Sequence, residues 1–177
     1  KGYGIRAAVW AGANLDKEAA PMLFDRGIVA PGVDAGYVDS ESVFGGKAFP
    51  GTVSQYNTGT QPFLKVNRNG ERFANESCPY DIVYAAAHQP GRVYAQIHDA
   101  NFAEDIERFH TIGCSAMSRN MPQMVTSSME KHIEAGLMFK CDTLDELADK
   151  MGFTGAAKDT FLATVERYNE LYDKQND

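Results

Sequence analysis

Tyr80 combines a residue type and a position that suit proton chemistry. It follows Ser77-Cys78-Pro79, in which Ser77 or Cys78 lies near a helix N-cap and Pro79 in the first helical turn. The helix dipole at that end stabilises a phenolate and lowers a tyrosine pKa that starts at about 10. Such a tyrosine donates a proton as phenol or accepts one as phenolate. The alternative interpretation is a core residue whose hydroxyl is hydrogen-bonded.

Cysteine and histidine, the common soft metal ligands, are spaced unsuitably for a metal site. The three cysteines contain no Cys-x-x-Cys pair, and the four histidines contain no His-x-x-x-His or His-Glu-x-x-His spacing; these residues are Cys78, Cys114, Cys141, His88, His98, His110 and His132. Three widely spaced cysteines also do not make a disulfide framework. We therefore expect no structural metal.

The composition is that of an ordinary globular protein. The 177 residues are 44% hydrophobic and 23% charged, and 17 basic against 24 acidic side chains give a net charge of −7. A chain of this length supports one sizeable core and at most one small second domain. The acidic balance argues against binding to nucleic acid or to anionic membranes, because no basic block exists to neutralise phosphates. No stretch approaches the roughly 20 apolar residues that a membrane-spanning helix needs.

The clearest local pattern lies at residues 62–76, PFLKVNRNGERFANE. An apolar run leads into Asn69-Gly70, a pair that supplies the two positive-φ positions of a tight β-hairpin turn. Charged residues follow the turn. We expect Arg72 and Glu76 to form an ion pair that supports the hairpin rather than to act in catalysis.

Helix and strand patterns surround this hairpin. Helices are predicted at about 4–15, 79–88, 100–110, 122–135, 143–151 and 156–173, and a buried strand at 92–99. The residues Thr143-Leu144-Asp145-Glu146 form a capping box. The apolar residues expected to face inward include Ile133, Leu144, Phe161, Val165 and Tyr172, and Trp10 is expected in core or interdomain packing. Because the elements do not alternate as βαβ units, we predict the α+β class: a small mixed sheet with a β-hairpin, packed by several helices.

Three segments of the chain resemble one group of flavoproteins, in the order in which that group carries them. The run VNRNGERFANE (66–76) resembles the V-N-x-x-G-x-R-F-x-N-E pattern of the fumarate reductase/succinate dehydrogenase-type flavoproteins, which include urocanate reductases and 3-ketosteroid dehydrogenases. Residues 142–173 are similar to the paired helices of that family. Residues 2–15 are similar to the Gly-x-Gly segment and Ala-Gly-Ala helix that lead from its flavin domain into its capping domain.

The resemblance implies the capping (substrate) domain of a larger FAD enzyme. Residues 1–35 would be a helix and connecting arm from the FAD-binding domain, and residues 36–177 the capping domain. The chain does not begin with Met and has no Gly-x-Gly-x-x-Gly fingerprint after a strand, so we expect a fragment that is inactive and holds FAD poorly by itself. The resemblance places Gly2 and Gly4 near the flavin, although Tyr3 stands where the family has Asp.

Proton transfer in the fumarate reductases uses positions that are occupied differently here. The resemblance places their donor Arg at Tyr80, the Glu that feeds it at Tyr56 and the relay Arg at Gly59. We therefore do not expect dicarboxylate reduction, because two carboxylates need a cationic clamp. The segment Asn-Glu-Ser-x-Pro-Tyr-Asp instead resembles the ketosteroid dehydrogenases, in which this tyrosine exchanges a proton with the substrate while the flavin exchanges the hydride.

The resemblance thus implies an FAD-dependent oxidoreductase that reduces or desaturates an activated carbon–carbon bond, with Tyr80 as the catalytic residue. The expected substrate is a small unsaturated molecule less acidic than fumarate, such as an enone, a steroid or an aryl-acrylate. The expected partners are the FAD domain of the same chain and an electron-donor protein. Two alternatives stay open: a fumarate- or urocanate-type reductase whose proton donor lies elsewhere, and a binding module without turnover.

Overall fold

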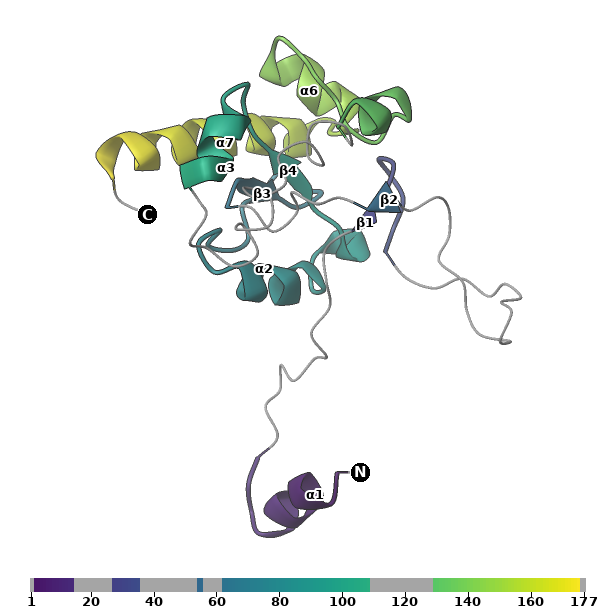
Figure 1. Ribbon diagram of the computed structural model, residues 1–177, viewed down its shortest axis with the longest axis vertical. Helices are drawn as coiled ribbons and strands as arrows, with labels where there is room; N and C mark the ends of the chain where they lie inside the picture. The colour runs from purple at the N-terminus through teal and green to yellow at the C-terminus, as the bar shows by residue number, and fades with distance from the viewer. Residues whose placement is uncertain (1, 15–26, 36–53, 56–61, 109–128, 176–177) are drawn as a thin grey trace, which may run out of the picture.

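A computed structural model describes residues 2–14, 27–35, 54–55, 62–108 and 129–175 (Figure 1). Its helices are α1 (Tyr3–Trp10), α2 (Pro79–Ala86), α3 (Phe102–Arg108), α6 (Leu144–Lys150) and α7 (Ala156–Lys174), with a short 3₁₀ helix at Pro90–Arg92 and helical residues at 129–134. Its strands are β1 (Gly27–Ile28), β2 (Ser54–Gln55), β3 (Leu64–Val66) and β4 (Ala95–Ile97). The predicted α+β class is confirmed. No described helix is both long and apolar enough to cross a membrane.

The described strands form two separate antiparallel ladders where the sequence predicted one small mixed sheet. One ladder pairs β1 with β2, and the other pairs β3 with β4. In the second ladder Leu64 lies opposite Ile97 and Val66 opposite Ala95. The strand predicted at 92–99 is therefore present, but it is shorter than expected and half-buried rather than buried.

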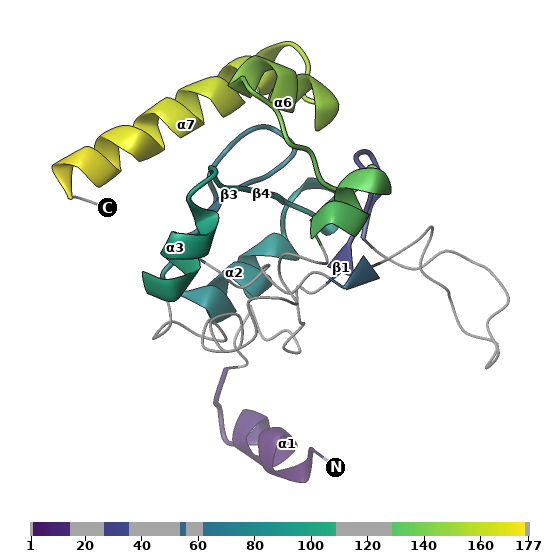
Figure 2. The same cartoon turned by 45° about the horizontal axis from the view of Figure 1, so that its top comes forward.

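The β3–β4 ladder is the middle layer of the main packed unit. In both views it lies between the α6–α7 pair on one side and α2 on the other (Figures 1 and 2). The buried core between the ladder and the α6–α7 pair consists of Leu64, Val66, Ala148, Phe153, Phe161 and Val165. Phe153 and Phe161 stack with their ring centroids 5.2 Å apart. Removing a side chain of this size from water contributes about 1.5–3 kcal/mol, so this cluster anchors α7 on β3.

The start of α6 follows the predicted capping box. The Thr143 Oγ1 accepts a hydrogen bond from the Glu146 backbone N–H at 3.2 Å, which satisfies one of the free donors of the first turn. The helix ends before Gly152, which has a φ of 83° and turns the chain back toward α7. A lysine of α7, Lys158, then pairs with Asp145 and Asp149 of α6. Local sequence signals therefore define this helical hairpin.

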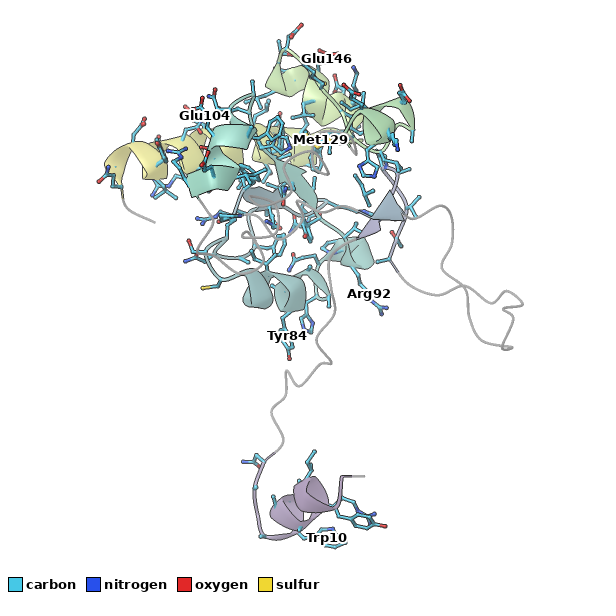
Figure 3. All side chains as sticks on the ribbon, viewed as in Figure 1. Trp10, Tyr84, Arg92, Glu104, Met129 and Glu146 are labelled. Carbon is cyan, nitrogen blue, oxygen red and sulfur yellow. The ribbon has the colours of Figure 1, made fainter. Side chains whose placement is uncertain are left out.

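Several predicted inward-facing residues are exposed instead. The exposed fraction is 40% for Ile133, 39% for Leu144 and 70% for Tyr172. Trp10 is 76% exposed and so lies outside the core of the described residues, and its interdomain packing stays a prediction (Figure 3). For Tyr172 the reason is length, because a 19-residue helix spans about 28 Å whereas a three-residue strand spans about 10 Å. The ladder therefore covers Phe161 and Val165 but not the end of α7. Helix α1 is also shorter than predicted, and all its residues are exposed.

The predicted tight hairpin at Asn69-Gly70 is wrong in its details. Only Gly70 of this pair has a positive φ, 79°, and the strand partner of β3 is β4. The chain after the turn makes a single antiparallel bridge, between Val66 and Arg72. The turn is wider because the buried Asn67 side chain accepts hydrogen bonds from the backbone N–H groups of Asn69 and Glu71. The Asn-Gly pattern alone did not predict these bonds.

Gly70 is required by contact with α7 as well as by its backbone conformation. A Cβ built on Gly70 would lie 2.4 Å from the Ala157 carbonyl oxygen and 2.5 Å from the Phe161 nitrogen. Both neighbours are helix backbone and cannot rotate away. The turn after β3 and the first part of α7 therefore approach as closely as a glycine allows.

Gly70→Ala should lower the free energy of unfolding by about 2–4 kcal/mol, since the new methyl group meets helix backbone at a left-handed φ. The matched control is Gly152→Ala, which has a similar φ of 83° but no atom within 4 Å of the new Cβ. Gly152→Ala should lower the free energy of unfolding by only about 1 kcal/mol. Urea unfolding monitored by circular dichroism measures both variants, and equal losses would contradict the close approach.

Candidate active site

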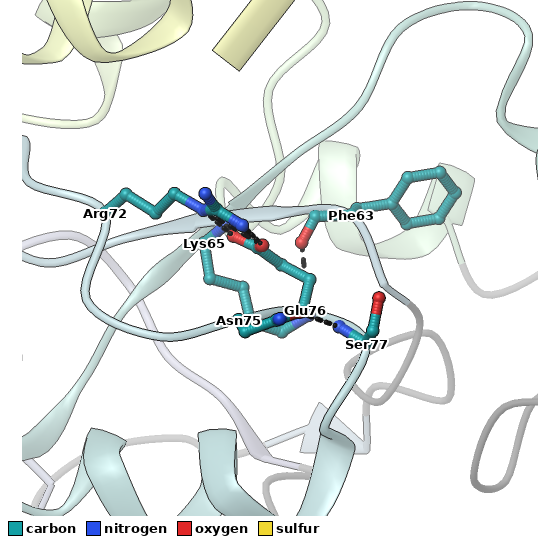
Figure 4. A network of polar contacts seen from close by, with 6 residues as sticks. All are labelled: Phe63, Lys65, Arg72, Asn75, Glu76 and Ser77. Carbon is teal, nitrogen blue, oxygen red and sulfur yellow. Dashed lines mark hydrogen bonds and ion pairs between the residues drawn. The ribbon is translucent and has the colours of Figure 1, made fainter. Parts of the chain in front are cut away.

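A buried ion pair lies directly before α2. Glu76 is 3% exposed, and its two carboxylate oxygens each lie 3.0 Å from the Arg72 Nε, which donates to them (Figure 4). The Arg72 Nη2 also donates to Glu76 Oε2 at 2.5 Å. The predicted ion pair is thus confirmed, and its burial makes the removal of one partner more destabilising than at a surface pair.

Lys65 joins this network from β3 and was missed by the sequence reasoning. Its side chain is 1% exposed, its Nζ donates to the Phe63 carbonyl oxygen at 3.3 Å, and its backbone N–H points to Glu76 Oε1 at 3.4 Å. The Nζ also lies 5.9 Å from the centre of the Tyr94 ring. Alternation along β3 places Lys65 on the face opposite Leu64 and Val66. Only the tertiary structure shows that this face is also covered.

The network also reaches α7. The Arg72 guanidinium carbon lies 5.2 Å from the centre of the Tyr168 ring, a cation–π distance. Arg72 therefore contacts Glu76 before α2, bridges to Val66 of β3 and stacks on α7. One side chain thus connects the segment that leads into α2 with the main packed core.

The turn between β3 and Arg72 is held by Asn67. Its Oδ1 accepts hydrogen bonds from the backbone N–H groups of Asn69 (2.9 Å) and Glu71 (3.0 Å). Its Nδ2 donates to the side chains of Glu71 (2.9 Å) and Gln89 (3.0 Å). Because Asn67 is only 4% exposed, these four bonds replace the water that a buried amide would lose.

Arg68, on the same turn, holds the described segment 27–35. Its Nη1 forms an ion pair with Asp34, and its Nη2 donates to the Val33 carbonyl oxygen at 2.7 Å. The Ala35 backbone N–H donates to the Gly91 carbonyl oxygen at 2.8 Å. This arginine is thus engaged with the protein's own carboxylate rather than directed as a free cation toward a ligand.

The start of α2 matches the prediction. Cys78 occupies the N-cap and Pro79 the first helical position, so Tyr80 lies in the first turn. Upstream, the Asn75 Oδ1 accepts from the Ser77 N–H at 2.9 Å and the Asn75 carbonyl oxygen accepts from the Cys78 N–H at 3.1 Å. The Tyr80 side chain lies outside the described part of the structure, so its catalytic role stays a prediction. Residues 56 and 59 also lie outside it.

Gly2 and Gly4 lie at the start of the described helix α1. Gly2 is the N-cap of α1 with a φ of 85°, and Gly4 lies in the first turn. A Cβ built on either glycine would have no atom of the described residues within 4 Å. Their contact with FAD stays a prediction.

An aromatic cluster with a histidine at its centre lies at the other end of β3. The His98 ring centroid is 5.1 Å from that of Phe63 and 5.1 Å from that of Phe102, while Ile106 and Met129 complete the apolar cluster. Burial lowers the pKa of His98 from its ordinary value of 6.5, and the hydrogen bond to the Asp99 carbonyl and the Asp99 charge oppose this. The described residues contain no group of His, Cys, Asp or Glu that could hold a metal ion.

Comparison with known proteins finds relatives among oxidoreductases. The chain is 26% identical to the vinyl phenol reductase of Lactiplantibacillus plantarum over an alignment of 186 positions that covers 99% of the chain. It is 35% identical over 116 residues (59% of its length) to the 3-oxosteroid 1-dehydrogenase of Mycolicibacterium smegmatis, and 25% over 115 residues (65%) to the NADH:acrylate oxidoreductase of Vibrio harveyi. It spans 34%, 18% and 10% of these proteins, respectively. No protein-family profile and no solved structure matches it.

Glu76→Ala should lower the free energy of unfolding by about 2–4 kcal/mol, because it leaves the partly buried Arg72 guanidinium without its carboxylate. The control is Glu146→Ala, which removes an ion pair of the same (i, i+4) spacing from the surface of α6, where both partners are 46% exposed. Water replaces that pair, so its loss should be much smaller. Chemical unfolding of both variants measures these losses of unfolding free energy. Similar losses would show that burial does not increase the contribution of the Arg72–Glu76 pair to stability.

Stability should fall as the pH is lowered through the range just below 6.5, the ordinary histidine pKa. Because burial lowers the pKa of His98 in the folded state, the unfolded state binds more protons in this range, and the stabilisation from neutral His98 is lost on acidification. Burial also lowers the pKa of His132, which contributes in the same direction. Between pH 7 and pH 5 the free energy of unfolding should fall less for His98→Phe than for the unmodified chain. Identical losses would contradict the assignment.

Proposed function

We propose that the chain is the capping (substrate) domain of a longer FAD-dependent oxidoreductase that reduces or desaturates an activated carbon–carbon bond. Residues 36–177 would form the cap, and residues 1–35 an arm from the FAD domain. The relatives support the reaction class, since their names denote a dehydrogenase, a reductase and an oxidoreductase. A vinyl phenol and an acrylate each contain a carbon–carbon double bond, and dehydrogenation of a steroid ring forms one.

The observation that carries the proposal is the position of Tyr80 in the first turn of α2. Reduction of a double bond conjugated with an activating group adds a hydride to one carbon and a proton to its neighbour, so the proton donor needs a fixed position. The first turn of a helix presents free N–H groups and the positive end of the dipole, which favour a phenolate. Tyr80 is therefore the proposed group that gives the proton in reduction or removes it in desaturation.

FAD would supply the hydride chemistry of such a reaction. Gly2 and Gly4 of α1 are the residues of this chain that would approach it. The part of the parent protein that binds FAD is expected outside this chain, which spans about a third of its vinyl phenol reductase relative. What this chain contributes is the substrate side of the site and the proton-transfer residue.

The charges near α2 support a substrate less acidic than fumarate. Arg72 is bound by Glu76, and Arg68 is bound by Asp34 and the Val33 carbonyl, so the protein's own acceptors occupy these two guanidinium groups. A dicarboxylate needs cations that are directed toward it. The proposed substrate class is therefore an enone, a steroid or an aryl-acrylate rather than fumarate.

The test is anaerobic oxidation of a reduced viologen by the full-length parent, with fumarate, urocanate, a cinnamate and a 3-ketosteroid as acceptors. Turnover with the bulkier, less charged acceptors alone supports the proposal. Turnover with fumarate would mean that the proton comes from a residue other than Tyr80. Absence of turnover with all four, in a parent that contains FAD, would favour the binding module.

Tyr80→Phe in the parent should lower kcat roughly 10²–10⁴-fold while KM changes little, because it removes the transferred proton and keeps the ring. The control is Tyr84→Phe, which makes the same change one turn later on α2 (Figure 3). That variant should retain most of the activity. Steady-state kinetics with the best acceptor of the panel measures both, and equal kcat values for Tyr80→Phe and the unmodified parent would exclude Tyr80.

A further inference from the structure

We infer that Glu76 is a positioning residue for Tyr80: its buried carboxylate, held by Arg72 and by the backbone of β3, fixes where α2 begins. The inference rests on the proposed role of Tyr80 in proton transfer. It assigns to the Arg72–Glu76 pair a function beyond support of the turn, namely control of the geometry of the site.

Glu76 is firmly anchored in the main packed unit. Glu76 lies four residues before Tyr80 and is 3% exposed. It accepts hydrogen bonds from the Arg72 side chain, and the Lys65 backbone N–H of β3 also points to it (Figure 4). Arg72 is itself tied to Val66 of β3 by a backbone bridge. The anchor is thus fixed to the ladder rather than to a loop.

The short segment between this anchor and Tyr80 is stiff. Asn75 closes it with two hydrogen bonds, from its side-chain oxygen to the Ser77 N–H (2.9 Å) and from its carbonyl to the Cys78 N–H (3.1 Å). Pro79 then fixes its own φ near the helical value. Few backbone torsions remain free, so a displacement of Glu76 is passed on to Tyr80.

A second anchor lies on the far side of Tyr80. Ile82, two residues later, is 1% exposed, and its N–H donates to the Cys78 carbonyl oxygen at 3.1 Å. The Tyr80 backbone is therefore held between a buried carboxylate and a buried isoleucine. Release of the first anchor lets the first turn pivot about Ile82, and an error of about 1 Å at a catalytic group can lower the rate about 100-fold.

A double-mutant cycle in the full-length parent tests the inference. Glu76→Gln keeps the size of the side chain but removes the charge that Arg72 binds. Alone it should lower kcat about 10–100-fold with KM changed by less than about twofold. In the Tyr80→Phe background it should have no further effect on kcat, because a residue that acts only through Tyr80 has nothing left to position.

Two variants separate positioning from a general loss of stability. Thr143→Ala removes the N-cap hydrogen bond of α6, outside the Arg72–Glu76 network, and should leave kcat unchanged at temperatures where it is folded. Asn75→Ala removes the side-chain bond to Ser77 at an exposed position. Asn75→Ala should lower kcat as Glu76→Gln does, and it should have no further effect on kcat in the Tyr80→Phe background. This variant tests the inference even if Glu76→Gln does not fold.

The outcomes distinguish the two proposals. An unchanged kcat for Tyr80→Phe overturns the proposed role of Tyr80 and this inference with it. If Tyr80→Phe lowers kcat but Glu76→Gln does not, or if the two losses multiply in the double variant, only the positioning role is overturned. A loss of kcat in Thr143→Ala equal to that in Glu76→Gln would also overturn it, because a general loss of stability would then explain both.

Discussion

The buried ion pair between Arg72 and Glu76 is the interaction on which the described structure around α2 depends. Glu76 is 3% exposed and bonds both the arginine and the backbone of β3, while Arg72 bridges to Val66 and stacks on Tyr168 of α7. A carboxylate removed from water is tolerated only with such partners. The pair therefore fixes three elements together, and its loss would leave a buried charge rather than a simple gap.

A second constraint acts from the other face of the ladder. Gly70 places the turn after β3 within a methyl group's distance of the α7 backbone, and the stacked Phe153 and Phe161 fill the space beside it. The two constraints meet in β3, whose alternate side chains face α7 and the Glu76 network. A strand of three residues thus transmits the position of the helical hairpin to the segment that leads into α2.

Local signals in the sequence predicted the elements well, because caps and turn residues act within a few positions of one another. The capping hydroxyl of Thr143, Pro79 at the start of α2 and the terminating Gly152 all lie where the sequence placed them. Predictions failed where a partner far along the chain decides the outcome. Tyr172 lies beyond the reach of the short ladder and is exposed, and Leu144 at the start of α6 is exposed as well.

The candidate site likewise has features that the sequence predicted and features that only the tertiary structure shows. The sequence by itself determined that Tyr80 lies in a helical first turn and that Arg72 and Glu76 pair, since both follow from spacings of four residues or fewer. Only the tertiary structure decided that Lys65 is buried, that β3 pairs with β4, and that Gly70 touches α7. Burial and strand pairing depend on which distant segment covers a face, and a local pattern carries no information about that segment.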